Sequence, residues 1–554
     1  MAWRGVTTRR ELSRLHDLAS ILIRYGFGEL VAKLGLVRLL ERADKVLPLG
    51  RLEALAKLPS PVRVRRAIEE MGPTFVKFGQ VLSTRVDLLA PEWIAELSRL
   101  QSQVPPADWT EIHAQMREDL GAPPEDLFRD VDPHPVAAAS IAQVHRARLP
   151  DGTTVALKIR RPGIERLIEA DMRLLQRAAH LVEARMPELR HLQPTAVLQQ
   201  FKDSLTTELD LADECRHAER IAANFREHPE LMVPKVFWAH TSQRMNVQEW
   251  VEGLSVSDPA ALQAAGLDRK RIAHQGAQIV LKMLFEDGFF HADPHPGNLF
   301  VLPDNRIALI DYGMVGRLTD TRREQFMVLL DGLVERDAER ATDVFLEWAR
   351  GTAVDEDRLA GDVDVLVDRY HGVALARLDM TAMVTDATAV LRRHRVVLPA
   401  DLSLMFKAIL TLEGMARTLD PEFNTVDVAR PFLRQSMSAR YAPATLARQG
   451  TRMAAELAAT LPRDLRRLTR AARAGRLRLP VEVNRSEETA SAGLERSVNR
   501  LTLGLVVAAL IVGASLTLPV SLGPSLHGVP LPSALGYLAA AVGAARLALS
   551  SRRH

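Results

Sequence analysis

The sequence predicts an α+β protein with a two-lobed core, a helical extension before the core and an apolar helical hairpin after it. Three observations support this prediction. Acidic and polar residues gather between His291 and Asp311 around a short strand-turn-strand pattern. Residues 141–159 alternate in the manner of paired strands. Residues 501–545 contain no Asp, Glu, Lys or Arg, which is typical of a segment buried in a membrane or an apolar core.

The composition of the chain narrows its function. Its 554 residues suffice for two or more domains with sizeable cores. The formal net charge of +3 is close to balance, so charge does not favour a nucleic-acid binder. Lysine occupies only ten positions, which makes each lysine worth inspecting. The single cysteine, Cys215, excludes an intrachain disulfide and a cysteine-cluster metal site, and its apolar helical neighbours predict a core residue.

The first 130 residues are predicted to form a helical extension. Apolar residues between positions 11 and 70 recur at helical spacing, with interruptions at Gly26, Gly28 and Gly35. Gly79 lies inside a further helical pattern, where glycine costs about 1 kcal/mol relative to alanine. We therefore expect another segment to approach the chain closely at Gly79.

A pair of strands follows the extension. Ile141–Leu149 and Thr154–Ile159 are apolar and β-prone, and the turn residues Pro150-Asp151-Gly152-Thr153 between them predict a hairpin. The strand period of two places Lys158 on the face opposite Val155 and Leu157. A lysine beside buried strands needs an anionic partner, so an acidic side chain is expected nearby.

The candidate partners of Lys158 lie on the next long helix, which the apolar spacing predicts as one element over residues 195–224. It carries Glu208, Asp210, Asp213 and Glu214. Acids on a helix are usually solvated, and this is the preferred interpretation of Asp213. For Glu214 we favour an ion pair with Lys158.

The stretch after His291 combines residue types that bind nucleotide and metal. Asp293 is followed five residues later by Asn298, and Asp311 opens an Asp-Tyr-Gly turn across a predicted hairpin of residues 299–310. Taken singly, each residue is more typical of a loop or turn. Together they supply a proton acceptor and two oxygen ligands for Mg²⁺ in the order in which a kinase-like fold arranges them around ATP.

A strand-like run that ends at residues 248–253 predicts a hinge between two lobes. We expect five parts: a helical extension, a kinase-like N-lobe, a kinase-like C-lobe, a basic segment and an apolar hairpin. Their predicted ranges are 1–130, 131–252, 253–450, 451–500 and 501–549.

The apolar C-terminal segment predicts a transmembrane hairpin. Pro519 and Pro532 bound a turn between two apolar halves, each of about 17 to 20 residues, enough to cross a hydrocarbon core of ~30 Å. Arg500 and Arg546 flank the halves and place both ends in the cytoplasm. The alternative is a buried hydrophobic hairpin. The arginine-rich residues 463–478 predict a helix that faces lipid headgroups; the alternative is a helix face exposed only to water.

Three motifs make the chain resemble the UbiB/AarF family of atypical protein-kinase-like proteins, over roughly residues 17–424. The most specific is Lys77-Phe78-Gly79-Gln80, which matches the Lys-x-Gly-Gln signature of that family. The second is an alanine-rich loop that begins at Ala137-Ala138-Ala139-Ser140 and stands where other kinases have a glycine-rich clasp. The third is Glu208-Leu209-Asp210, the Glu-x-Asp motif.

The resemblance implies ATP and Mg²⁺ as cofactors, ATPase or unorthodox kinase activity, and a role in isoprenoid quinone biosynthesis of the ubiquinone type. It also implies specific roles. Lys158 would grip phosphates and Glu214 would position it, with Ala137, Ala138, Ala139 and Ser140 over the nucleotide. Asp293 would be the catalytic acid, and Asn298 and Asp311 the metal ligands. Lys77 and Gln80 would lie over the site, with Lys77 facing Glu208.

Two residues depart from the family pattern, and one loop has a physical meaning of its own. His217 stands where asparagine is expected and Tyr312 where phenylalanine is usual; neither change removes a phosphate or metal contact. The Cβ atoms of Ala137–Ala139 hold the loop off the phosphates and restrict positive φ. We therefore expect poor phosphoryl transfer to proteins and favour ATP turnover linked to a lipid event.

Three functions fit these residues. The first is a membrane-tethered ATP-dependent factor that makes lipophilic quinone precursors accessible. The second is a small-molecule or lipid kinase that transfers the γ-phosphate, and the third is a nucleotide-binding scaffold without turnover. The expected partners are membrane lipids or quinone precursors and quinone-biosynthesis enzymes, with a homodimer left open and nucleic acid excluded. The expected location is the inner membrane, with the kinase-like part on the cytoplasmic side.

Overall fold

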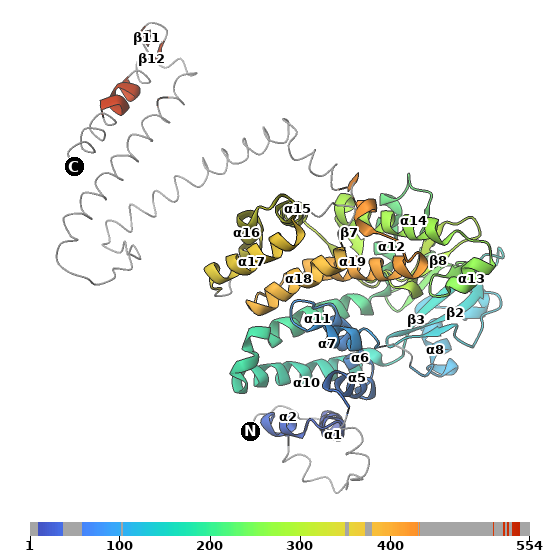
Figure 1. Ribbon diagram of the computed structural model, residues 1–554. Coiled ribbons are helices and arrows are strands. Elements are labelled where there is room, and N and C mark those ends of the chain that lie inside the picture. The colour runs from blue at the N-terminus through green and yellow to red at the C-terminus, as the bar shows by residue number, and fades with distance from the viewer. Residues whose placement is uncertain are drawn as a thin grey trace. The chain divides into compact units, whose positions relative to one another are not determined.

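The computed structural model describes residues 9–36, 58–100, 104–349, 354–371, 379–429 and 431–432, with short pieces at 514, 525–526, 529–530 and 535–542. The chain separates into two units, Met1–Arg448 and Gln449–His554. Figure 1 labels the elements of both units. The first unit contains every element that carries a predicted site residue.

The extension is helical, as predicted. Gly26 (φ +81°) and Gly35 (φ +74°) adopt left-handed backbone directly after the first two helices and so end them. Gly79 lies against Leu100, because a Cβ at this glycine would collide with Leu100 Cδ1. The close approach expected at Gly79 is therefore present. The helices are α1 (Arg9–Arg24), α2 (Gly28–Lys33), α5 (Ser60–Met71), α6 (Pro73–Ser83), α7 (Pro91–Leu97), α8 (Trp109–Leu120) and α9 (Pro124–Leu127).

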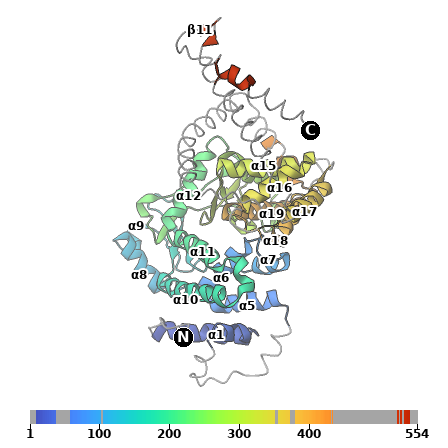
Figure 2. The same ribbon diagram turned by 90° about the vertical axis from the view of Figure 1, so that its left-hand side faces the viewer.

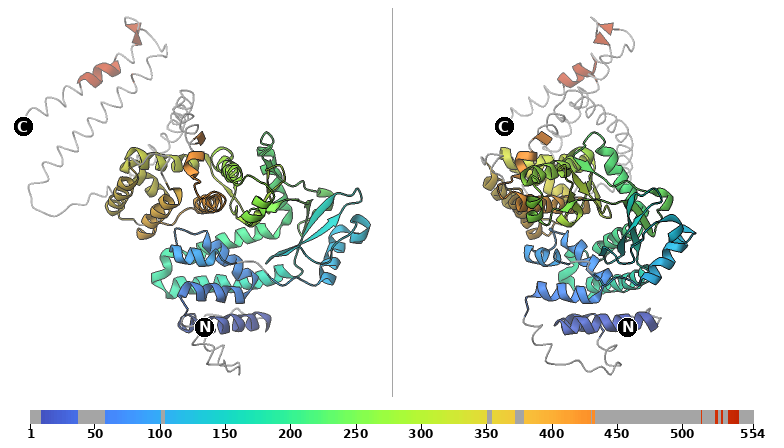
Figure 3. Two further views of the ribbon diagram at one scale, coloured as in Figure 1. Left: turned by 45° about the vertical axis from the view of Figure 1, so that its right-hand side comes forward. Right: turned by 90° about the vertical axis from the view of Figure 1, so that its right-hand side faces the viewer.

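A four-stranded antiparallel sheet forms the N-lobe, with strand order β1-β2-β3-β5. The predicted hairpin is present as β2 (Ala142–Arg148) and β3 (Thr154–Arg160). In this register Lys158 on β3 stands opposite Asn246 on β5. The other strands are β1 (Ala137–Ala138) and β5 (Met245–Glu249). Figure 3 shows β2 and β3, drawn in cyan, beside the extension helices.

The long helix expected over residues 195–224 is two helices, and the prediction of one element was wrong. The chain breaks at Asp210, whose side chain accepts hydrogen bonds from the backbone N–H groups of Ala212 (3.0 Å) and Asp213 (3.3 Å). Such a cap satisfies N–H groups that a helix start leaves unpaired, and it competes with helix continuation. The result is α11 (Pro194–Leu209) followed by α12 (Leu211–Asn224), with α10 (Ile164–Arg185) before them.

The C-lobe surrounds the largest apolar core, to which β7–β10 and the helices after residue 259 contribute. A second sheet has the order β4-β9-β8-β6, and β7 pairs with β10. The second sheet consists of β4 (Leu231–Met232), β6 (Leu254–Ser255), β8 (Leu299–Val301) and β9 (Ile307–Leu309), and the separate pair consists of β7 (Phe289–His291) and β10 (Val315–Arg317). The main helices are α13 (Pro259–Ala264), α14 (Arg269–Lys282), α15 (Asp320–Glu335), α16 (Ala338–Trp348), α17 (Glu356–Tyr370), α18 (Met380–Arg393) and α19 (Ala400–Leu419).

Helices α5, α6 and α7 connect the extension to the C-lobe, since they lie between α1 and the pair α18 and α19 in both Figure 1 and Figure 2. One buried carboxylate fastens this contact. Arg85 donates two hydrogen bonds to Asp87 (2.9 and 2.7 Å). The backbone N–H of Leu398 also donates to Asp87 (2.9 Å). Arg392 on α18 reaches back to the carbonyl oxygen of Val86 (2.5 Å).

The predicted transmembrane hairpin and the basic segment before it fall almost wholly outside the described residues. Only the short pieces between 514 and 542 belong to the described part of residues 501–549. Within the described ranges, no helix combines the length and apolar composition that a membrane span requires. The hairpin stays a prediction.

We expect Asp87→Ala to lower the free energy of unfolding by about 3–5 kcal/mol, because it leaves the buried Arg85 charge without its partner. Urea denaturation followed by tryptophan fluorescence measures this, since all six tryptophans lie before residue 449. The control is Asp304→Ala, which breaks an exposed pair with Arg306 (2.6 Å). This substitution should change stability little, because solvent screens an exposed ion pair. Equal losses in both variants would contradict the importance of Asp87.

Candidate active site

Lys158 lies between two acids that come from distant parts of the chain. Its Nζ donates to Oε1 of Glu214 on α12 (2.8 Å) and lies 3.3 Å from Oδ1 of Asp311 after β9. The Glu214 side chain is 6% exposed, whereas that of Asp311 is 48% exposed. The structure therefore brings the predicted pair of Lys158 and Glu214 together. It leaves Asp311 open toward a ligand.

The pKa values of these three groups follow from burial and mutual charge. Burial opposes the charge of Lys158, but Asp311 and Glu214 outweigh it and raise its pKa. Burial raises the pKa of Glu214 to about 7, against the attraction of Lys158. For Asp311 the positive charges of Lys158 and Lys77 outweigh burial, so its pKa lies well below the ordinary value. Asp311 is thus an ionised oxygen donor at neutral pH.

The backbone around Asp311 is held in an unusual conformation. Asp311 has φ +61°, a left-handed conformation that aspartate tolerates better than most residues. Buried His291 donates from Nε2 to the Asp311 carbonyl oxygen (2.6 Å). The Tyr312 hydroxyl donates to the carbonyl oxygen of Leu309 (2.8 Å), and His217 Nδ1 lies 3.2 Å from the Tyr312 carbonyl oxygen. Both departures from the family pattern, His217 and Tyr312, therefore support the turn that carries Asp311.

The loop after β7 fixes Asp293 through its own backbone. The Asp293 N–H donates to Nδ1 of His291 (3.1 Å), and the Asp293 carbonyl oxygen accepts from the His295 N–H (2.7 Å). Asn298 donates from Nδ2 to the same carbonyl oxygen (3.4 Å). The loop thus holds Asp293 and Asn298 together, as the motif predicts. The hydrogen bond uses the amide nitrogen of Asn298 and does not involve its amide oxygen.

Lys407 is a site residue that sequence reasoning missed. From α19 its Nζ lies 2.8 Å from Oδ1 of Asp293, and the two side chains are 16% and 30% exposed. Burial would raise the pKa of Asp293, but Lys407 and His295 outweigh it and lower the pKa. No motif connects positions 114 residues apart in sequence. The available signal was the rarity of lysine, which occupies only ten positions.

The Lys-x-Gly-Gln helix α6 brings a third lysine to the site. Lys77 Nζ lies 2.6 Å from Oε1 of Glu208, at the end of α11. Burial opposes the Lys77 charge, but Glu208, Asp311 and Asp293 together raise its pKa. Gln80 donates instead to the carbonyl oxygen of Leu100 (3.0 Å), a contact within the extension. Lys77 thus faces Glu208 as expected, while a role for Gln80 over the site stays a prediction.

The alanine-rich loop forms a tight strand turn. Ala137 and Ala138 pair with β2, and the Ala139 N–H donates to the carbonyl oxygen of Ala142 (2.8 Å). None of the residues 137–140 has positive φ. Arg161 binds the Ala139 carbonyl oxygen (2.9 Å), and Ser140 is buried. The loop is therefore fixed by its own contacts, and its role over the nucleotide stays a prediction.

The residues suit a magnesium ion that binds together with nucleotide phosphates. In the described part of the chain, no group of three or more His, Cys, Asp or Glu side chains is placed to hold a metal ion alone. Mg²⁺ in nucleotide sites usually takes one or two protein ligands plus phosphate oxygens and water. An ionised, half-exposed Asp311 and the amide oxygen of Asn298 match this requirement.

Comparison with known proteins identifies three family models along the chain. The ABC1 atypical kinase-like domain matches residues 99–345, the UbiB helical domain residues 363–424, and the ABC1/UbiB kinase-like C-terminal domain residues 485–553.

Curated proteins and solved structures also match the chain. "Probable protein kinase UbiB" of Aliivibrio fischeri (strain MJ11) is 35% identical over 79% of this chain and 81% of its own length. A protein of the same name from Aeromonas salmonicida (strain A449) is 34% identical over 79% of this chain and 81% of its own length. "Uncharacterized protein sll1770" of Synechocystis is 35% identical over 68% and 64%. The complex structure of Rv3197-erythromycin from Mycobacterium tuberculosis gives a TM-score of 0.45 at 23% identity, over 62% of this chain and 87% of that chain.

We expect Lys407→Met to lower the rate of ATP turnover roughly 10²-fold, because Asp293 loses the cation that orients it and balances developing phosphate charge. Lys407→Arg should restore much of the rate, since a positive charge returns. The assay is phosphate release at saturating ATP.

The matched control is Lys282→Met, which removes another mostly buried lysine that lies 2.8 Å from an acid, Asp287. It should lower stability without changing the turnover per folded molecule. Similar turnover in Lys407→Met and Lys282→Met would remove Lys407 from the site.

Proposed function

Because this chain belongs to the ABC1/UbiB family of atypical kinase-like proteins, we propose that it is a membrane-anchored ATPase that supports isoprenoid quinone biosynthesis. The resemblance seen in the motifs is confirmed by the family models and the curated relatives. A kinase-like enzyme follows from that membership. The finer proposal is ATP-dependent handling of lipophilic precursors of ubiquinone, with quinone-biosynthesis enzymes as partners.

The observation that carries the proposal is the position of Lys77. Its ion pair with Glu208 holds α6 against the site, where the charges of Asp311 and Asp293 also act on it. A kinase acting on proteins needs an open groove beside its catalytic aspartate. Here α6 brings a mostly buried lysine, 14% exposed, to that region. ATP turnover with a small or lipophilic substrate therefore fits better than phosphorylation of a protein.

Each site residue has a distinct task in this proposal. Lys158, oriented by Glu214, binds nucleotide phosphates. Asp311 and Asn298 would hold Mg²⁺, which neutralises phosphate charge when it is bound. Asp293 accepts a proton from the attacking water or hydroxyl group, and Lys407 keeps its carboxylate ionised and oriented.

A lipid or small-molecule kinase is the second candidate, and the geometry of Asp293 favours it specifically. The Asp293 side chain is 30% exposed, so a substrate hydroxyl group could reach it. A scaffold without turnover fits less well, because Lys158, Asp293, Asn298 and Asp311 are all present. Transfer of the γ-phosphate to lipid separates the two active alternatives.

We further propose that residues 501–549 anchor the chain in the inner membrane and leave the kinase-like part on the cytoplasmic side. The proposal rests on the two uncharged apolar halves and the arginines that flank them. The full chain should sediment with membranes after lysis without detergent. A chain that ends at residue 490 should stay in the supernatant, and a soluble full-length chain would refute the anchor.

Asp311→Asn should weaken ATP binding roughly tenfold or more in the presence of Mg²⁺, because a neutral amide is a poorer magnesium ligand. Without Mg²⁺ the affinities of variant and wild type should differ much less. Titration calorimetry with and without Mg²⁺ measures both. Asp213→Asn, which neutralises an acid on α12, is the control and should bind like the wild type.

The proposed function is tested with γ-labelled ATP and the full chain, with and without vesicles that contain an isoprenoid phenol. We expect release of free phosphate that the vesicles stimulate, with no label in lipid. Lys77→Ala should change this rate several-fold, whereas Lys202→Ala, on the exposed side of α11, should not. Label in the lipid fraction would establish the kinase instead.

A further inference from the structure

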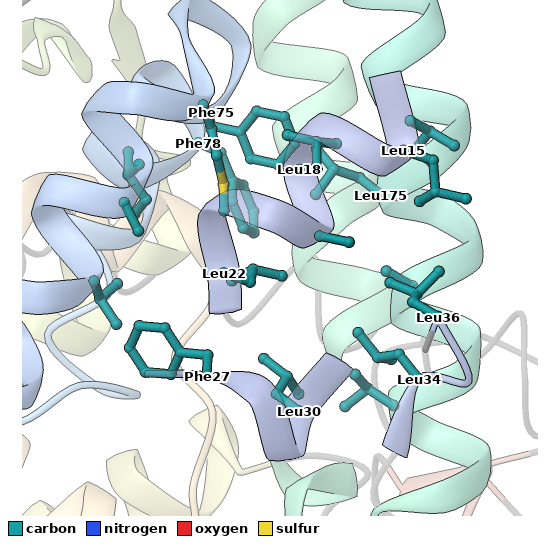
Figure 4. Close-up of a pocket in the computed structure, with 18 of the residues that line it drawn as sticks. Leu15, Leu18, Leu22, Phe27, Leu30, Leu34, Leu36, Phe75, Phe78 and Leu175 are labelled. Carbon is teal, nitrogen blue, oxygen red and sulfur yellow. The ribbon is translucent and has the colours of Figure 1, made fainter. Parts of the chain in front are cut away.

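An apolar cavity of about 350 Å³ lies in the extension, between α1, α2, α5, α6 and α10. All of its lining residues are Leu, Ile, Val, Ala, Met or Phe. Figure 4 shows Leu18 and Leu22 of α1, Leu30 of α2, and Phe75 and Phe78 of α6 directed toward one space. The cavity is separate from the nucleotide site and no residue of that site lines it.

The lining decides what class of ligand the cavity can hold. Water needs two to four polar partners, so an apolar cavity stays dry; one of about 150 Å³ is enough for a benzene ring. This cavity is more than twice that size. A peptide strand would bring backbone N–H and C=O groups that the lining could not satisfy, which is unfavourable. A flexible hydrocarbon chain has no such groups.

A positive charge stands at the edge of the cavity. The guanidinium of Arg63 lies 5.2 Å from the ring centre of Phe27, which lines the cavity. Gly26 permits this approach, because a Cβ there would lie 2.6 Å from Arg63 Nη1. The Arg63 guanidinium donates to the Tyr25 carbonyl oxygen (3.3 Å) and to the Ser60 hydroxyl (3.1 Å), both neutral groups, and its Nε has no hydrogen-bond partner. In the part of the chain that the structure describes, no carboxylate pairs with this arginine. An anionic headgroup would complement the charge.

Helix α6 joins this cavity to the nucleotide site. Phe75, Phe78 and Leu82 line the cavity. Lys77, between two of them in sequence, pairs with Glu208 at the site (2.6 Å). A ligand that displaces the cavity face of α6 would therefore also move Lys77 relative to Asp311 and Asp293.

We propose that this cavity binds the hydrocarbon chain of one lipid, with a small anionic headgroup at Arg63, and that occupancy acts on ATP turnover through α6. The coupling rests on the proposed ATPase function, whereas the binding site does not. The occupant is a single linear chain, such as an isoprenoid, because the cavity exceeds the needs of one ring and offers no polar contact inside.

The experiment uses the full chain in phosphatidylcholine nanodiscs and a farnesyl phosphate analogue with a diazirine at the far end of its chain. After illumination, mass spectrometry locates the label. We expect label on peptides from α1, α5, α6 or α10, displaced by unlabelled farnesyl phosphate. Label confined to residues 501–545, or label that the competitor does not displace, would overturn the proposal.

Two variants test the two ends of the ligand. Ala67→Phe places a ring in the cavity and should lower labelling at least tenfold without lowering the unfolding temperature; Ala178→Phe is the substitute if it does not fold. A second probe carries the same diazirine on farnesol, which lacks the phosphate. Arg63→Ala should weaken capture of the farnesyl phosphate probe roughly tenfold but leave capture of the farnesol probe unchanged. Arg66→Ala, an exposed arginine on the same helix, is the control.

The outcomes separate the cavity from the proposed function. Labelling that Ala67→Phe does not reduce, or a crosslink showing another part of this chain or a second copy in the cavity, would refute the binding site. Absence of ATP turnover in the wild type would refute the proposed function while the labelling result still stands. If Ala67→Phe abolishes labelling but vesicles stimulate turnover as in the wild type, the coupling through α6 is wrong.

Discussion

The shared ion pairing of Lys158 is the interaction on which the site depends. One ammonium group connects β3, α12 and the turn after β9 through Glu214 and Asp311. Removing one partner of such a largely buried group costs several kcal/mol, because the other charges stay unbalanced. The neighbouring pairs of Lys77 with Glu208 and Lys407 with Asp293 repeat this logic. Three lysines thus neutralise three of the four acids, and the remaining negative charge favours a cation at the half-exposed Asp311.

The extension is part of the site, because one of the three lysines comes from it. Its helix α6 contributes one of the three lysines and at the same time lines an apolar cavity on another face. The site therefore has a wall that belongs to a separate core, the cluster of α1, α2, α5 and α6. Because α6 belongs both to this apolar cluster and to the site, a molecule that contacts the cluster can change the position of Lys77 in the site.

Local chemistry made much of this arrangement predictable. The hairpin of β2 and β3 follows from its turn residues, and Lys158 could be paired with Glu214 because a buried lysine requires an acid. The break between α11 and α12 at Asp210 was missed because the apolar spacing continues across it. The break is caused by the Asp210 side chain, which caps the start of α12. Lys407 was missed because only the packing of α19 brings it to Asp293. Tertiary contacts of this kind leave no periodic trace in a sequence.

The buried Asp87 has a consequence for the order in which the molecule can be completed. One of its hydrogen bonds comes from Leu398, which follows it by 311 residues. During synthesis the extension leaves the ribosome before the kinase-like region does, so Asp87 cannot form its hydrogen bond with Leu398 until nearly all of that region has been made. Closing so long a loop is slow compared with local helix formation. The extension is therefore among the last parts of the fold to be fixed, and a nascent chain that stops short of residue 398 lacks the hydrogen bond that joins the extension to the C-lobe.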